Sequence, residues 1–425
     1  MPKSRLAVLA GCRTPQAKAF GKLAEASAVE LGVAVVHATS KRASITAEQL
    51  DEVIFGNVAG PPDAANVARV IALAAGVPHD RIAHTVSRNR ASGMEAIVSS
   101  WQAIEEGRAG LIMAGGTESM SKIPLLVRES TKRKLLHLAR AKSWSARLKE
   151  LLSFRTQDLR PIAGVELGLT DPASGMNMGQ TAELLAEEFS ISREEQDAFA
   201  LESHRKAVDA TKRSFLSGEI AAIQVAGQDV KFDVGPRAEQ SIEQLAKLRP
   251  FFKMGGTVTP GNSCPLTDGA TALLLTSEAD AQHRDEPPLG FVTDYAIAGC
   301  DPRRMGLGPV FATARLMQQT GLQLSDFDLV EINEAFAAQV LACLQAFESP
   351  GFAREHLHRD SPLGTVAMEK LNVNGGAIAL GHPVGATGAR LVLTLLRALR
   401  ERGLKRGLAT LCVGGGQGVA MLLET

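Results

Sequence analysis

The sequence predicts an α/β fold built from two similar halves. Hydrophobic residues make up 45% of the 425 residues and charged residues 22%, values typical of a folded chain rather than a disordered one. The single Tyr, two Trp and 40 Gly indicate an aliphatic core with small-residue turns. Such a core suits buried parallel strands better than an antiparallel sandwich. The length favours two or three compact units.

In the first half, short apolar runs alternate with segments of helical spacing. Four runs are expected to form strands: 5–10, 51–57, 83–87 and 109–116. Two segments are expected to form helices: 65–75 and 93–107. The last of these strands ends in a glycine turn.

The second half repeats that order. Its expected strands are 326–333, 371–374 and 406–416, and its expected helices begin at 334 and span 385–402. Each half therefore contains a strand, a small-residue loop, a helix, a further strand and a glycine turn. This repetition indicates an internal duplication.

The middle region, residues 122–250, breaks the pattern. Residues 122–155 contain ten Lys or Arg and two Glu, a local charge of +8, and interspersed leucines make the segment amphipathic. It is consistent with a solvated helical face, or with a surface for a phosphate-bearing ligand, an anionic membrane or an acidic partner. Residues 181–210 have helical spacing, with a helix-start signal at 190–195.

Charge and hydropathy exclude several classes of protein. Lys and Arg number 46, as do Asp and Glu, so the chain has no overall basic field for nucleic acid, and no nucleic-acid motif is present. The sequence contains no uninterrupted run of about 18 apolar residues, so a membrane-spanning helix is not expected. The short apolar run near the start predicts a strand rather than a signal peptide.

The five cysteines stand at positions 12, 264, 300, 343 and 412. They are odd in number, widely spaced and form no CxxC pair, so neither a zinc site nor a disulfide framework is indicated. We therefore expect no metal and a reducing, cytoplasmic location.

Residues 374–390 form a glycine-rich segment that leads from a strand into a helix, and His382 lies in its turn. An isolated histidine is usually structural. Reactive groups of α/β proteins are commonly found at strand-to-helix turns, however, and this context favours a functional His382.

Cys412 lies at the end of a predicted strand, shortly before three glycines, 414–416. A cysteine in a buried strand is usually inert. Here the glycines leave peptide N–H groups that can hold an oxyanion. A histidine beside Cys412 would stabilise a thiolate, which makes this residue a candidate for proton transfer.

Two further candidates are ambiguous from the residues alone. Asn333 follows a predicted strand, and its amide can position a water or a carbonyl, or cap the next helix. Residues 255–269 form a turn-dense loop of the kind that often lines ligands. Cys264 in that loop is a second candidate thiol, although an unreactive loop cysteine is the simpler interpretation.

Taken together, these segments resemble the thiolase family over essentially the whole chain. The matching segments are 13–15, 115–120, 178–183, 256–259 with Asn262 and 268–269, 333–336, 381–383 and 412–416. Several independent motifs in one order argue against chance. The basic middle region makes the chain most similar to the thiolase subunits of fatty-acid β-oxidation complexes.

The resemblance implies a CoA-dependent acyltransferase, which cleaves a 3-ketoacyl-CoA or condenses acyl-CoA molecules in reverse. Helix, sheet, helix, sheet and helix layers would form the core. Residues 1–121 with 251–279 would form the N-terminal half, 122–250 a mainly helical loop domain over CoA, and 280–425 the C-terminal half.

The resemblance also implies partners. CoA would be a substrate, with no tightly bound cofactor, and the chain would form a homodimer or homotetramer. Residues 122–155 would contact a hydratase/dehydrogenase partner or an anionic membrane.

Residue roles carry over by position. His382 would be the base that activates a nucleophilic cysteine, and Cys412 the acid and base for the second substrate. Asn333 would hold a water that forms one oxyanion hole with His382. Peptide N–H groups near position 90 and at Gly414 would form the other.

The residues expected to contact CoA form one set: Met178, Ser263, Cys264 and Phe336.

The position of the nucleophile does not fit the family. Arg90 stands where the family has its cysteine, and no cysteine lies between Cys12 and Cys264. A guanidinium is not deprotonated in proteins and cannot attack a carbonyl. Loss of a nucleophile commonly costs on the order of 10³ to 10⁶ in rate.

We therefore expect a thiolase with impaired turnover. The alternatives are a non-catalytic acyl-CoA-binding protein, in which Arg90 binds a carboxylate or blocks the channel, and a scaffold subunit of a β-oxidation complex.

Overall fold

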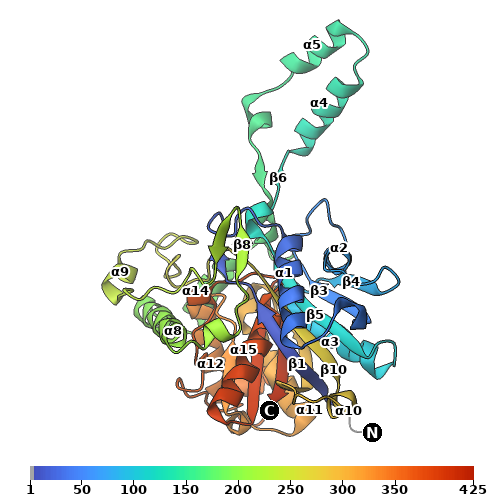
Figure 1. Ribbon diagram of the computed structural model, residues 1–425. Helices are drawn as coiled ribbons and strands as arrows, with labels where there is room; N and C mark the ends of the chain where they lie inside the picture. The colour runs from blue at the N-terminus through green and yellow to red at the C-terminus, as the bar shows by residue number, and fades with distance from the viewer. Residues whose placement is uncertain (1–3) are drawn as a thin grey trace.

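The computed structural model describes residues 4–425. Its main sheet has ten strands, nine of them in the order β4-β3-β5-β10-β1-β11-β14-β13-β12, with β2 (Ala17–Lys18) paired to β10 (Figure 1). The nine strands are β1 (Leu6–Arg13), β3 (Glu52–Gly56), β4 (Ile82–Val86), β5 (Leu111–Glu118), β10 (Thr267–Ser277), β11 (Gly290–Gly299), β12 (Leu329–Ile332), β13 (Arg406–Val413) and β14 (Gln417–Glu424).

The sheet contains one arrangement twice. In the first half, β3 runs parallel to β4 and β5, and β10 is antiparallel to β5 and β1. In the second half, β12 runs parallel to β13, and β14 is antiparallel to β13 and β11. The two halves join where Leu6 to Val8 pair with Gly290 to Val292. The predicted duplicated α/β fold is confirmed.

The strand predicted at 371–374 is wrong. Leu371 forms a single bridge to Val330, and the chain then turns at Asn372, whose φ is 44°. The Asn372 side chain takes over the pairing with β12. Its Oδ1 accepts from Ile332 N at 2.9 Å, and its Nδ2 donates to Ile332 O at 3.0 Å.

Helices cover the sheet and fill the space between its halves. The first half contributes α1 (Ala28–Arg42), α2 (Val67–Ala74) and α3 (Ser92–Glu105); the second contributes α11 (Gly308–Thr320), α12 (Ala337–Glu348) and α15 (Thr387–Arg402). Helix α1 packs on β10 and β1, and α11 packs on β11 and β14. Helices α3 and α15 pack against each other.

Glycines allow α3 and α15 to approach closely. A Cβ on Gly93 would lie 2.6 Å from the backbone N of Ala389, and one on Gly388 would lie 2.5 Å from Met94 N. Since Cβ atoms are not found at such distances, the contact requires glycine on both helices. The pair brings the turns that precede α3 and α15 to the centre of the molecule.

The middle region contains a helical pair that projects from the body. Helices α4 (Glu129–Arg140) and α5 (Trp144–Leu152) extend away from the sheet, connected to it through β6 (Leu125–Leu126) and β7 (Ile162–Ala163) (Figure 1). Among the described residues, no helix is both long and apolar enough to cross a membrane.

The rest of the middle region packs on the body. Its remaining elements are α6 (Gly164–Gly168), α7 (Met178–Glu188), α8 (Arg193–Lys212), β8 (Ile223–Val225), β9 (Gln228–Val230) and α9 (Ile242–Ala246). The predicted helical stretch at 181–210 is thus two helices. The start signal is confirmed, because Ser192 and Glu195 form a capping box at the start of α8.

Candidate active site

The candidate active site lies where four segments from both halves meet. Arg90 lies in the turn before α3, Asn333 follows β12, His382 lies in the turn before α15, and Cys412 is near the end of β13. The charge of Arg90 is close enough to act on both His382 and Cys412: it adds to the lowering of the His382 pKa by burial, and it opposes the raising of the Cys412 pKa by burial. The structure therefore brings together residues that are up to 322 positions apart in sequence, from Arg90 to Cys412.

The loop predicted to line a ligand connects two of these segments. Ser263 forms a bridge with Phe336, three residues after Asn333. Leu266 forms a bridge with His382. This loop therefore fixes the position of the segment after β12 relative to the turn before α15.

His382 is a buried, neutral base. Its Nδ1 lies 2.7 Å from the hydroxyl of Thr387, which itself donates to the Pro383 carbonyl at 2.8 Å. Because a hydroxyl has one hydrogen, Thr387 accepts from Nδ1–H, and Nε2 keeps its lone pair. Nε2 has no hydrogen-bond partner among the described residues. Burial, with the charges of Arg90 and Arg390, holds the pKa of His382 well below its usual range.

Glu334 fixes the chain that leads to His382. Its buried carboxylate accepts from Ser203 Oγ at 2.6 Å, Asn372 Nδ2 at 2.8 Å and the peptide N of Ile378 at 3.1 Å. Burial raises its pKa, and these three donors oppose the shift. The carboxylate thereby attaches residues 372–378 to the end of β12.

Glu118, in the first half, also fixes the chain beside His382. Its carboxylate accepts from the peptide N–H groups of Val58 at 3.1 Å, Ala59 at 3.0 Å and Gly385 at 2.9 Å. Burial raises its pKa to about 7 against the effect of these donors. Because Gly385 is in the turn of His382, this contact links the two halves next to the site.

The Asn333 side chain is completely buried. Its Nδ2 and Oδ1 have no hydrogen-bond partner among the described residues, which is uncommon for a buried amide. The alternative that Asn333 caps a helix is wrong, because α12 begins at Ala337 with Phe336 in the capping position. The amide is therefore available to a water or a carbonyl.

Both candidate thiols are protonated at neutral pH. Burial raises the pKa of Cys412, and the charge of Arg90 partly opposes that shift. Burial raises the pKa of Cys264 to about 12, again against the effect of Arg90. Cys412 can thus donate a proton, whereas Cys264 has too little thiolate to act as a nucleophile.

Arg90, which stands where the family resemblance predicts the nucleophile, is largely buried. Its side chain is 7% exposed, and its Nη1 lies 3.4 Å from Met178 Sδ and 3.9 Å from Met305 Sδ. A Cβ on Gly414 would lie 3.3 Å from that nitrogen. The preceding residue, Asn89, has a φ of 43° and donates to Gly414 O at 2.8 Å. Arg90 therefore lies next to the glycines predicted to form an oxyanion hole.

The residues predicted to contact CoA lie around the same centre. Met178 begins α7 and contacts Arg90, and Ser263 and Phe336 pair as described above. The Phe336 ring packs edge to face on Phe252 at 5.9 Å. Cys264 is half-buried. Their contact with CoA stays a prediction.

Sequence reasoning missed three residues that shape the site: Thr387, Glu118 and Met305. Thr387 and Glu118 lie within or beside segments that carry the family resemblance, and a polar residue at the end of a buried strand or the start of a buried helix is a signal for such a role. Met305 lies in a 3-10 helix, η5 (Pro302–Leu307), that has no motif.

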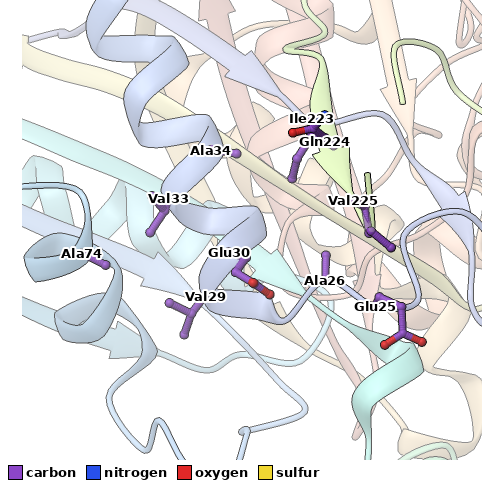
Figure 2. Close-up of a pocket in the computed structure, with 11 residues that line it drawn as sticks. Glu25, Ala26, Val29, Glu30, Val33, Ala34, Ala74, Ile223, Gln224 and Val225 are labelled. Carbon is purple, nitrogen blue, oxygen red and sulfur yellow. The ribbon is translucent and has the colours of Figure 1, made fainter. Parts of the chain in front are cut away.

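A separate surface pocket lies between α1 and β8 (Figure 2). Its volume is about 580 Å³, and Val29, Val33, Ile223, Glu25 and Glu30 are among its lining residues. It contains none of the predicted site residues and no histidine or cysteine. Among residues 4–425, no group of three or more His, Cys, Asp or Glu side chains is placed to hold a metal ion.

Comparison with known proteins gives a consistent result. Residues 6–279 match the model of the thiolase N-terminal domain, and residues 286–425 match that of the thiolase C-terminal domain. The chain is 40% identical to a 3-ketoacyl-CoA thiolase of Yersinia pestis (strain Pestoides F) over 424 residues, which cover 99% of this chain and 97% of the relative.

Two solved structures are similar to this chain over nearly its whole length. A Bacillus anthracis acetyl-CoA acetyltransferase is 37% identical with a TM-score of 0.86, over 100% of this chain and 99% of that one. Human mitochondrial 3-ketoacyl-CoA thiolase in complex with CoA is 35% identical with a TM-score of 0.86, over 99% and 98% of the two chains. With both domains matched in order across almost all of its length, the chain belongs to the thiolase family of acyltransferases.

Proposed function

We propose that this chain binds acyl-CoA as its relatives do and that Arg90 prevents it from accepting the acyl group. One observation carries the proposal: the His382 lone pair and the protonated Cys412 lie within the electrostatic reach of Arg90, a side chain that cannot be a nucleophile, and the Asn333 amide is buried without a partner among the described residues. These three residues support the proposal as the remaining members of an acyl-transfer site.

With a thiol at position 90, these groups would support thiolysis. His382 Nε2 takes the thiol proton, and the sulfur attacks the C3 carbonyl of a 3-ketoacyl-CoA while Asn333, through a water, stabilises the oxyanion. The C2–C3 bond breaks, and Cys412 protonates the departing acetyl-CoA enolate. The Cys412 thiolate then takes the thiol proton of CoA. The CoA sulfur attacks the acyl-enzyme, and the released sulfur recovers its proton from His382.

The experiment is thiolysis of a 3-ketoacyl-CoA by the parent chain and by Arg90→Cys. We expect the variant to exceed the parent by about 10³-fold or more, the usual effect of a nucleophile. Arg90→Ala is the matched control, because it removes the bulk and charge of Arg90 without supplying a thiol. It should remain as inactive as the parent.

Two results would contradict the proposal. Equal activity in Arg90→Ala and Arg90→Cys would show that position 90 is not the nucleophile's place. CoA binding by all three proteins with no turnover in any would favour the alternative, a non-catalytic acyl-CoA-binding or scaffold protein.

We further propose that the α4–α5 pair binds an anionic membrane surface. The pair carries exposed apolar side chains, Trp144 at 75% and Leu152 at 78%, beside exposed basic residues such as Lys132 and Arg133. Exposed apolar and basic groups on one projection are typical of interfacial helices. A hydratase/dehydrogenase partner is the competing occupant.

We also propose that the chain forms a homodimer or homotetramer and is located in the cytoplasm. Residues 122–250 would cover bound CoA. Support for self-association comes from β4, which among the described residues pairs only with β3 and exposes Ile82 at 49%. An exposed edge strand of this kind is a ready surface for pairing with another chain.

A further inference from the structure

The guanidinium of Arg90 differs from the other deeply buried guanidinium groups of this chain. Arg13 lies 2.6 Å from each of two carboxylates, and Arg390 lies 3.3 Å from Glu331. Among the described residues, Arg90 has no carboxylate within ion-pair distance, and its Nη1 contacts only the sulfur atoms of Met178 and Met305. Thioethers are weak acceptors, so a buried positive charge is left uncompensated.

The surroundings of Arg90 add to this excess of positive charge. His382 is neutral, and Cys412 and Cys264 are protonated thiols, so none of the three supplies a negative charge. The Asn333 amide, a donor as well as an acceptor, is buried without a partner among residues 4–425. The two carboxylates described at the site, Glu334 and Glu118, accept from other donors. Among residues 4–425, Arg90 is thus a buried cation without an ion-pair partner.

We propose that Arg90 makes this site a receptor for a carboxylate, carried at the end of a short acyl chain on CoA or by a free short-chain acid. One guanidinium offers a single charge and a planar pair of N–H donors, which match the single charge and two oxygens of a carboxylate. A phosphate dianion would leave a net negative charge buried. The CoA-linked form rests on the proposed function, since it places the acyl end at the position of the nucleophile.

Two probes of equal chain length test the proposal. Succinyl-CoA and butyryl-CoA each carry four acyl carbons and differ by the terminal carboxylate. We expect the full chain to bind succinyl-CoA about 10- to 100-fold more tightly by calorimetry, the range of one charge-assisted, bidentate contact. In Arg90→Met, which keeps length without charge, the preference should disappear.

Controls separate recognition from folding and from general charge. Arg402→Met removes an exposed cation at the end of α15 and should keep the full preference. Arg90→Lys keeps the charge but loses the paired donors, so it should keep a reduced preference. If circular dichroism shows that Arg90→Met is unfolded, the reduced preference of Arg90→Lys for succinyl-CoA over butyryl-CoA tests the proposal instead.

The free-acid form has its own test. Propionate at about 50 mM should raise the unfolding temperature of the parent but not of Arg90→Met, if a free acid is the ligand. Stabilisation by propionate without a preference for succinyl-CoA identifies the free acid, and the converse identifies the acyl-CoA. A parent that shows neither effect overturns the proposal, even where Arg90→Cys gains thiolysis and the proposed function stands.

Discussion

At the scale of single residues, His204 couples stability to pH. It is 5% exposed on α8, and its Nδ1 accepts from the peptide N of Arg237 at 3.2 Å. Burial, with the charge of Arg237, lowers its pKa from 6.5 to about 4. Between these values the unfolded chain binds more protons than the folded chain, so the free energy of unfolding decreases as pH falls from 6.5 to 4.

His204→Asn should remove this dependence, because Asn Oδ1 can accept the same hydrogen bond without titrating. We expect the parent to lose up to about 3 kcal/mol more than the variant between pH 6.5 and pH 4. Urea unfolding at several pH values measures the difference. Identical slopes for the two proteins would mean that His204 is already protonated in the folded state.

The residues of the site show what sequence patterns can reveal. His382 and Cys412 were predicted from glycine-rich turns, whose function depends on local sequence. The role of Thr387 was not predicted, because it depends on which hydroxyl lies close to His382 Nδ1 once the turn has folded. The prediction of a strand at 371–374 was wrong for a related reason. The Asn372 side chain, rather than the backbone, makes the hydrogen bonds to β12, and the apolar pattern of a sequence does not reveal such a side-chain contact.

At the scale of elements, the crossing of α3 and α15 depends on glycines that leave no room for a Cβ. Gly93→Ala would place a Cβ 2.6 Å from Ala389 N and 3.1 Å from Gly385 O, both backbone atoms. We expect a loss of about 1–3 kcal/mol, the usual cost of overpacking. Denaturant unfolding at neutral pH gives the value.

Gly168→Ala is the matched control. Gly168 ends α6, has no atom within 4 Å of its would-be Cβ, and is not among the glycines with positive φ. The same change there should leave stability unaltered or raise it by up to about 1 kcal/mol. A comparable loss at both positions would mean that the helix crossing tolerates a methyl group.

At the scale of the whole molecule, the projecting α4–α5 pair is the surface that we propose binds an anionic membrane. Lys134 is unsuitable for a test, because its Nζ lies 2.7 Å from Asp158 and donates to Ser153 O at 2.6 Å, which links α4 to the segment after α5. Lys132→Glu with Arg133→Glu changes only exposed side chains. We expect the parent to sediment with anionic vesicles and not with zwitterionic ones, and the double variant to bind about tenfold or more weakly.

Charge reversal on the body supplies the control for that experiment. Arg402 and Lys405 are exposed and lie at and just beyond the end of α15. Reversing both should leave vesicle binding intact. A parent that stays in solution with both kinds of vesicle would refute the membrane proposal and leave a protein partner as the occupant of this surface.

The repeated strand order has an evolutionary consequence. The turn before α3 follows β4, which is parallel to β3, and the turn before α15 follows the single parallel bridge of Leu371 to Val330 in β12. Because each turn then leads into a central helix, the two occupy equivalent places in the two halves. A tandem gene duplication would first have given both turns the same side chain. They now carry different side chains, Arg90 and His382, so the candidate active site takes residues from both copies.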